Sequence, residues 1–142
     1  MTDDLLVPFD GSLLSKRAVE YVAEKHPDAA VTILHVVDPI GVVYEAEAHG
    51  LADAETWHER ATEAAERACA DAAKIAADVG CDVTTAVETG RPARVILEYV
   101  EDHDIDHVVM GSHGRSGASR LLLGSTAERV VRRSPVPVTV VR

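Results

Sequence analysis

Short apolar runs alternate along the chain with longer segments whose hydrophobic residues recur at helical spacing. The short runs are rich in β-branched residues, and several are apolar on both faces, as expected of buried parallel strands. We predict strands over residues 4–9, 30–38, 81–88, 106–111 and 136–142. The helical spacing predicts helices over 15–26, 54–79, within 89–104 and over 125–134, whereas residues 39–53 lack a clear period and are predicted to form a long loop.

Strands that alternate with helices predict a parallel sheet, because each parallel pair needs a crossover connection that covers one face. The expected fold class is therefore α/β, a doubly wound five-stranded parallel sheet with helices on both faces, as in Rossmann-like domains. The chain has 142 residues and shows no internal repeat, low-complexity tract or linker. We expect a single domain over residues 1–142.

The net charge of −10 is unevenly distributed along the chain. Residues 1–110 carry 23 acidic and 8 basic residues, whereas residues 111–142 carry 1 acidic and 6 basic residues. A mainly acidic surface argues against nucleic acid or an anionic membrane as a partner, since both are bound through broad positive faces. The excess of basic residues in 111–142 is still compatible with a local site for an anion.

Other features of the composition bear on the cellular setting. Lysine makes up 3 of the 14 basic residues, a bias typical either of a halophilic protein or of a GC-rich genome, and composition does not separate the two. The first apolar run follows acidic residues rather than a positive leader, and no run reaches the length of a membrane span, so we expect a cytoplasmic protein. Cys69 and Cys81 lack the spacing of a zinc site and are expected to be small buried hydrophobes.

The segment VVMGSHGRSGASRLLLGSTAERVV, residues 108–131, joins the fourth predicted strand to the last predicted helix. Four of its residues are glycines: Gly111, Gly114, Gly117 and Gly124. Without a Cβ, these residues can adopt positive φ angles and let an anion approach backbone N–H groups closely. Arg115 and Arg120 add positive charge, and the helix that Ser125 opens presents unpaired N–H groups. The segment has the parts of a phosphate cradle.

A second interpretation of this segment needs no ligand. Ser125 and Glu128 have the spacing of a capping box, in which each side chain satisfies the other residue's backbone N–H, and the glycines would then provide only flexibility. Neither a Walker loop nor a G-x-G-x-x-G dinucleotide fingerprint occurs. The local chemistry leaves both interpretations, phosphate cradle and connector, open.

The glycines also follow a longer pattern. Gly111-x2-Gly114-x9-Gly124-Ser125 resembles the nucleotide-binding pattern G-x2-G-x9-G-[ST] of the universal stress protein family. VPFDGS near the start, LHVVD in the second predicted strand and SPVPVTVVR at the end extend the resemblance over the chain. It implies an adenine nucleotide alpha hydrolase-like fold that binds ATP, or AMP or ADP, with Mg²⁺, in a cytoplasmic stress-response module.

The resemblance also implies roles for particular residues. Asp10 would contact the nucleoside, the backbone of Val36 would read the adenine edge, and Met110 would flank the nucleotide. The phosphate and ribose contacts would come from Gly111, His113, Gly114, Arg115, Gly124, Ser125 and Thr126. Considered without the resemblance, Asp10 also fits an Asx-turn in the sequence DGS, and Val36 and Met110 also fit a hydrophobic core.

Two other functions remain open from the sequence. A slow ATPase or phosphotransferase would need a base, and His113 is the one candidate; because a loop histidine is more often solvated or a ligand donor, we assign no residue to catalysis and none to a metal. A nucleotide-free dimeric interaction module would use the last strand, through which members of the resembling family form homodimers. The homodimer contact is accordingly expected at residues 136–142, although Pro135 and Pro137 could instead protect that edge.

Overall fold

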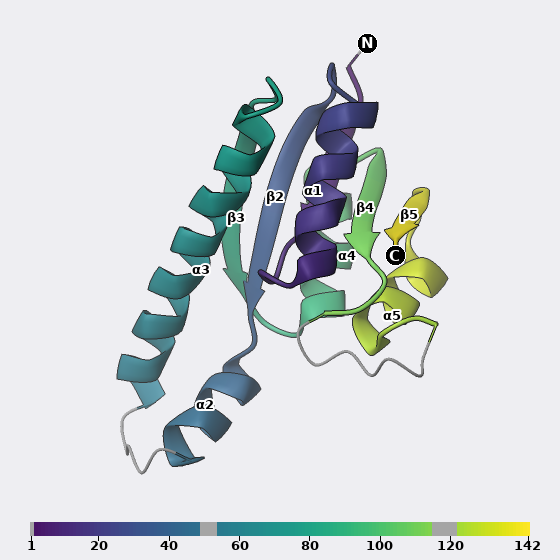
Figure 1. Cartoon of the computed structure of the whole chain (residues 1–142). Coiled ribbons are helices and arrows are strands. Elements are labelled where there is room, and N and C mark those ends of the chain that lie inside the picture. The colour runs from purple at the N-terminus through teal and green to yellow at the C-terminus, as the bar shows by residue number, and fades with distance from the viewer. Residues whose placement is uncertain (1, 49–53, 115–121) are drawn as a thin grey trace.

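All five predicted strands are present and form one sheet in the computed structural model, which describes residues 2–48, 54–114 and 122–142 (Figure 1). The strands are β1 (Asp4–Pro8), β2 (Ala30–Val37), β3 (Val83–Thr89), β4 (His107–Gly111) and β5 (Val138–Val141). They run parallel, in the spatial order β3-β2-β1-β4-β5. The predicted five-stranded parallel sheet is confirmed.

Helices cover both faces of this sheet. α1 (Leu13–Lys25) and α3 (Ala54–Ala77) pack on one face, and α4 (Pro92–Asp102) and α5 (Ser125–Arg133) pack on the other. Figure 1 shows α1 and α3 in front of the sheet and α4 behind it. The connections therefore wind away from the centre of the sheet in both directions, and the doubly wound Rossmann-like arrangement is confirmed.

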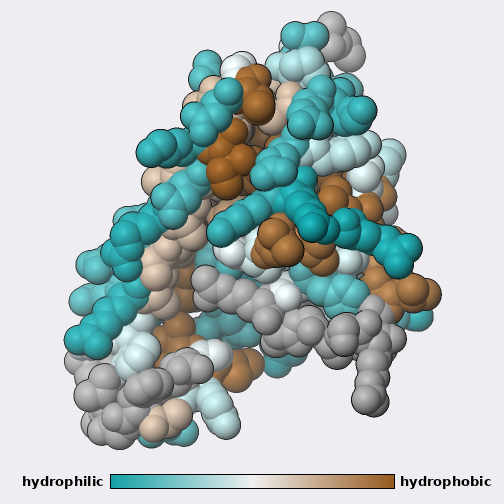
Figure 2. Space-filling view, viewed as in Figure 1, coloured by the Kyte–Doolittle hydropathy of each residue, from teal (hydrophilic) through white to brown (hydrophobic). Residues whose placement is uncertain are grey.

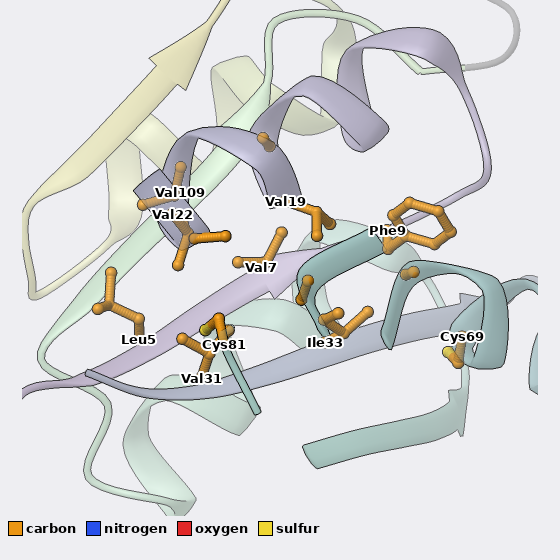
Figure 3. Packing of buried hydrophobic residues seen from close by; sticks show 14 residues of the cluster. Leu5, Val7, Phe9, Val19, Val22, Val31, Ile33, Cys69, Cys81 and Val109 are labelled. Carbon is orange, nitrogen blue, oxygen red and sulfur yellow. The ribbon is translucent and has the colours of Figure 1, made fainter. Parts of the chain in front are cut away.

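The central strand β1 accounts for the run that is apolar on both faces. Leu5, Leu6 and Val7 are fully buried. Because side chains alternate along a strand, Leu5 and Val7 pack beneath α1 and α3, whereas Leu6 packs beneath α4 and α5. Figure 3 shows the first of these clusters, in which Val22 of α1 lies with Leu5, Val7 and Val109 of the central strands. Burial on both faces fixes the position of β1, and with it the loop that follows.

Both cysteines lie in the same cluster. Cys69 of α3 and Cys81, just before β3, are free thiols and are 2% and 3% exposed. Burial penalises the thiolate and raises the pKa of both thiols. The prediction that they are small buried hydrophobes is confirmed.

The predicted loop over residues 39–53 is wrong in its first part, which forms the helix α2 (Pro39–Ala48). Asp38 caps this helix: its Oδ1 accepts from the Ile40 N–H at 2.9 Å and its carbonyl accepts from the Val42 N–H at 3.1 Å. Val42 is buried against β2 and α3, while other apolar residues of α2 are exposed. The helix shows no clear period in the sequence because its apolar residues lie on both its inner and its outer side.

The long alanine-rich helix predicted from the sequence is α3, with 24 residues. It ends at Ala77 rather than at Val79, and Gly80, with a φ of 80°, turns the chain toward β3. Among the described residues, no helix combines the length and the apolar character that crossing a bilayer would need.

Candidate functional site

The candidate site lies at the carboxyl edge of the sheet, where β1 and β4 end side by side. The two strands pair directly, Leu5 with His107 and Leu6 with Val108. The chain leaves β1 for α1 on one face and leaves β4 for α5 on the opposite face. Open parallel sheets bind their ligands at such a reversal of strand order, so the loops after β1 and β4 are the ones to examine.

The loop after β1 is a tight turn built on Asp10. Its Oδ1 accepts from the backbone N–H of Ser12 at 2.9 Å, and Gly11 between them has a φ of 82°. Ser12 is the N-cap of α1, and its Oγ accepts from the N–H of Ser15 at 3.3 Å. The Asx-turn is therefore confirmed, and the cap explains why α1 begins at Leu13 rather than at the predicted Ser15.

The two loops touch through a second contact of Asp10. A Cβ placed on Gly114 would lie 2.5 Å from the Oδ2 of Asp10, so any larger residue there would have to displace this carboxylate. Gly111, at the end of β4, is close to α1 instead: a Cβ there would lie 2.8 Å from the Cβ of Leu14. The structure brings Asp10, Gly111 and Gly114 together, as the resemblance implies.

The described glycines of residues 108–131 do not use the positive φ angles that glycine permits. Positive φ occurs at glycines elsewhere in the described chain, namely Gly11, Gly80 and Gly90, and not at Gly111, Gly114 or Gly124. Gly124 has a φ of −68°. Close packing limits the space at these glycines: a Cβ would meet Leu14 at Gly111 and the Asp10 carboxylate at Gly114, and at Gly124 it would lie 3.3 Å from the Ser112 carbonyl oxygen.

His113 and Ser112 occupy the centre of the described loop. The Oγ of Ser112 lies 3.1 Å from Nδ1 of His113. The backbone of Ser112 joins two distant segments, because its N–H donates to the Val141 carbonyl at 2.8 Å and its carbonyl accepts from the Gly124 N–H at 2.6 Å. His113 Nε2 is buried, and within the part of the chain that the structure describes it has no hydrogen-bond partner.

Gly124 packs closely against this histidine. A Cβ on Gly124 would lie 3.3 Å from the Ser112 carbonyl oxygen and 3.7 Å from Cδ2 of His113. The sequence analysis did not identify Ser112 as a residue that positions the loop. No local pattern marks that role, since its backbone partners Val141 and Gly124 are distant in sequence.

The first turn of α5 differs from the capping-box prediction. Gly124 is the N-cap and makes no side-chain hydrogen bond, so Ser125 is the first residue of the helix rather than its cap. The Glu128 carboxylate pairs instead with Arg132 at 3.0 Å, and the Glu128 N–H donates to the Gly124 carbonyl. The capping box is thus ruled out, because the residue in the cap position carries no side chain.

Backbone N–H groups are consequently available at the start of α5. Among the described residues, none accepts a hydrogen bond from the backbone N–H of Ser125, Thr126 or Ala127. Ser125 is exposed and Thr126 is half-buried. This helix end has the donors and the positive dipole end that bind anions.

Val36 and Met110 both belong to the hydrophobic core, as their second interpretation held. Met110 is 5% exposed, and the half-buried Val36 packs against the same cluster. The backbone of Val36 nevertheless faces the site. Leu34 directs its carbonyl toward β1, where it accepts from the Phe9 N–H at 2.8 Å, and Val36, two residues further, directs its N–H and carbonyl to the same side beyond the end of β1.

Some predicted residues lie outside the described part of the chain. They are Arg115, which the resemblance implies as a phosphate contact, Gly117 and Arg120. The structure places the other predicted residues, which are Asp10, Val36, Met110, Gly111, His113, Gly114, Gly124, Ser125 and Thr126, at or next to the carboxyl edge between β2, β1 and β4.

A pair of histidines lies at the opposite edge of the sheet. His107 Nε2 is 2.8 Å from Thr139 Oγ1, and the ring stands edge-on to His26 with centroids 5.7 Å apart. Burial, and secondly the neighbouring His26, lower the pKa of His107. His103 stacks on Tyr99 instead, with ring centroids 3.7 Å apart. The described residues contain no group of three His, Cys, Asp or Glu side chains able to hold a metal ion.

Comparisons with known proteins show which family the chain belongs to. A model of the Universal stress protein family matches residues 1–142. The universal stress protein MJ0531 of Methanocaldococcus jannaschii is 34% identical over 143 residues, which cover 97% of this chain and 81% of that protein. The solved structure of hypothetical protein MJ0577, from the same organism, has a TM-score of 0.84 and 31% identity over 99% of this chain and 96% of that one.

A further structure, of a universal stress protein in complex with cAMP, has a TM-score of 0.70 and 23% identity over 99% of this chain and 96% of that one, and shares the fold. The family match extends over the whole chain, including the glycine segment and both loops of the candidate site. The chain therefore belongs to the universal stress protein family.

Proposed function

We propose that this protein binds an adenine nucleotide, ATP or else AMP or ADP, between β1 and β4, and acts as a cytoplasmic, homodimeric stress-response module. The observation that carries the proposal is His113 Nε2, which is buried without a partner among the described residues, next to the uncapped start of α5. A buried polar atom without a hydrogen bond is costly, and an uncapped helix start attracts anions. One phosphate group would satisfy both.

Ser112 supports a donor role for His113. When its hydroxyl donates to Nδ1, the proton of the neutral imidazole resides on Nε2, which can then donate to a phosphate oxygen. Ser112 itself is only 3% exposed, so its hydroxyl is not placed to attack a bound nucleotide. The pair favours binding over nucleophilic catalysis.

The nucleoside would lie on the β1 and β2 side of the site. Asp10 offers a carboxylate that accepts hydrogen bonds, and Val36 offers the backbone N–H and carbonyl that β1 leaves uncovered. A backbone pair of this kind can read the edge of a purine. cAMP, the ligand in one of the similar structures, has the same adenine and ribose as ATP. The part of the site that binds the nucleoside would therefore serve both ligands.

Mg²⁺ would be coordinated mainly by the phosphate oxygens of the nucleotide. Magnesium in nucleotide sites keeps several waters and takes one or two protein carboxylates in addition to phosphate oxygens. Within the described residues Asp10 is the carboxylate in contact with the glycine segment, through Gly114. The metal would therefore screen the repulsion between Asp10 and the phosphates.

The test is calorimetric titration of the full chain with ATP, ADP, AMP and cAMP, with and without magnesium. We expect micromolar binding of ATP and at least tenfold weaker binding by Gly124→Ala, because its Cβ would lie 3.3 Å from the Ser112 carbonyl oxygen, and the backbone beside His113 would have to shift. The matched control is Gly41→Ala, where a Cβ has room, its nearest neighbour lying at 4.0 Å.

The outcomes separate the candidate functions. Binding that Gly124→Ala weakens and Gly41→Ala leaves intact supports the site. If no adenine nucleotide binds, the glycine segment is a connector and a nucleotide-free dimeric interaction module becomes the better account. If both variants bind the nucleotide as well as the unmodified chain does, the nucleotide lies elsewhere on the protein and the proposed site is wrong. Melting curves of both variants check that the fold is retained.

A further inference from the structure

α2 presents an apolar stripe to solvent. Ile40, Val43 and Tyr44 are 61%, 44% and 72% exposed, which is unusual for large hydrophobic side chains on one element. Their spacing of three and four residues places them on one face of the helix. Contiguous exposed apolar residues on an otherwise charged surface mark interaction sites more often than single ones do.

The core does not use this face. α2 is held from its other side, where Val42 packs with Val37 of β2 and Ala65 of α3, and Trp57 lies against the same cluster. At 100° per residue, Val42 points away from the stripe. α2 is thus anchored by one side and leaves the other available.

A cavity adjoins the stripe between α2 and the start of α3. Its volume is about 340 Å³, and it is lined by Pro39, Val42, Val43, Glu55, His58 and Glu59. Val43 belongs to both the stripe and the cavity, so the two form one continuous surface. A hollow beside an apolar stripe is the arrangement that receives the anchor residues of an amphipathic helix.

The charges around this surface are mainly negative. Glu55 and Glu59 line the cavity, and Glu47 is exposed at the end of the stripe. Figure 2 shows hydrophilic residues following the exposed side of α3. Two-fold pairing of this face with a second copy would bring these carboxylates together, and an anionic bilayer would be repelled. A cationic partner would be attracted.

We propose that the α2 stripe, together with the cavity between α2 and α3, is a docking site for a basic amphipathic helix of a partner protein. One apolar side chain of the partner enters the cavity beside Val43, and its flanking arginines or lysines face Glu55 and Glu59. The site lies outside the nucleotide-binding residues and does not depend on them.

The experiment uses two synthetic amphipathic helices with the same leucine face, one flanked by arginines and one by glutamates, titrated into the full chain by fluorescence anisotropy. The arginine peptide is expected to bind in the micromolar range and the glutamate peptide at least tenfold more weakly. Val43→Ser and Glu59→Lys are each expected to weaken binding of the arginine peptide about tenfold.

Matched controls lie on the same molecule. Val131→Ser removes a valine that is 43% exposed, against 44% for Val43, and Glu63→Lys changes an exposed glutamate one turn along α3 that does not line the cavity. Both controls should bind the peptide as the unmodified chain does. Circular dichroism and melting curves verify that each variant is folded.

The proposal is overturned if the arginine peptide does not bind, if the glutamate peptide binds equally well, or if the controls lose as much affinity as the test variants. It is also overturned if Ile40→Ser with Tyr44→Ser converts a dimer to a monomer in light scattering, since a second copy would then cover the stripe. Selective loss with Val43→Ser and Glu59→Lys supports it.

Discussion

At the residue scale, the two carboxylate oxygens of Asp10 have different surroundings. Oδ1 accepts from the Ser12 N–H and shapes the turn, while Oδ2 faces Gly114 of the other loop. The Asx-turn and the ligand contact are therefore compatible, because they use different atoms. An amide in place of the carboxylate could keep the turn, whereas a methyl group could not.

We expect Asp10→Ala to lower the free energy of unfolding by about 1 kcal/mol, because the Ser12 N–H loses its acceptor. Asp10→Asn should stay within about 0.5 kcal/mol of the unmodified chain. AMP binding should weaken about tenfold in Asp10→Ala and remain within about threefold in Asp10→Asn. Urea denaturation and calorimetry give the two quantities. Equal loss in both variants would show that the charge itself, not the hydrogen bond, matters.

At the element scale, α1 and α5 both begin at the carboxyl edge of the sheet but differ in how their N-termini are capped. Ser12 caps α1 with its hydroxyl, whereas Gly124 leaves α5 without a side-chain cap. A cap satisfies backbone N–H groups that a ligand would otherwise bind. The uncapped helix is thus the one suited to phosphate.

This difference predicts opposite effects of two similar substitutions. Ser12→Ala should lower the free energy of unfolding by about 1 kcal/mol, the usual value for an N-cap. Ser125→Ala should change it by less than about 0.5 kcal/mol, since the exposed Ser125 side chain caps nothing, and should weaken ATP binding instead. Urea midpoints and calorimetry measure both. A Ser125→Ala variant as unstable as Ser12→Ala would restore the capping box.

At the scale of the whole molecule, the sheet has β5 at one edge and β3 at the other. The carbonyls of Pro137 and Val141 face β4, where they accept from Val108 and Ser112. Because backbone groups alternate along a strand, Val138 and Val140 direct their N–H and carbonyl groups away from the sheet. These are the groups through which a second copy could extend the sheet.

We expect Val140→Pro to convert the proposed homodimer to a monomer in light scattering. Proline removes the outward N–H without breaking the ladder to β4, so the fold should persist. The matched control is Thr85→Pro, at an exposed position on β3. The Gly90 N–H donates to the Val37 carbonyl of β2, and because backbone groups alternate along a strand, the Thr85 N–H points away from the sheet. A dimer that survives Val140→Pro but not Thr85→Pro would place the contact at β3.

Much of the architecture could be predicted because its signals are local. The apolar run around Leu5, Leu6 and Val7 marks a strand buried on both faces, and the turn in DGS follows from the short reach of the Asp10 side chain. The glycine pattern located the candidate site, and the structure brings Asp10 and Gly114 into contact there. Such signals need only neighbours in the sequence.

The five strands, four of the helices, the central buried strand and the segment that forms the candidate site could all be predicted from the sequence, since periodicity and turn chemistry are properties of short stretches. Three features became visible only in the folded chain: residues 39–48 form α2, Gly124 rather than Ser125 is the N-cap of α5, and His113 Nε2 is buried with no hydrogen-bond partner among the described residues. These features depend on long-range packing, such as Ser112 joining Gly124 and Val141, which no local pattern encodes.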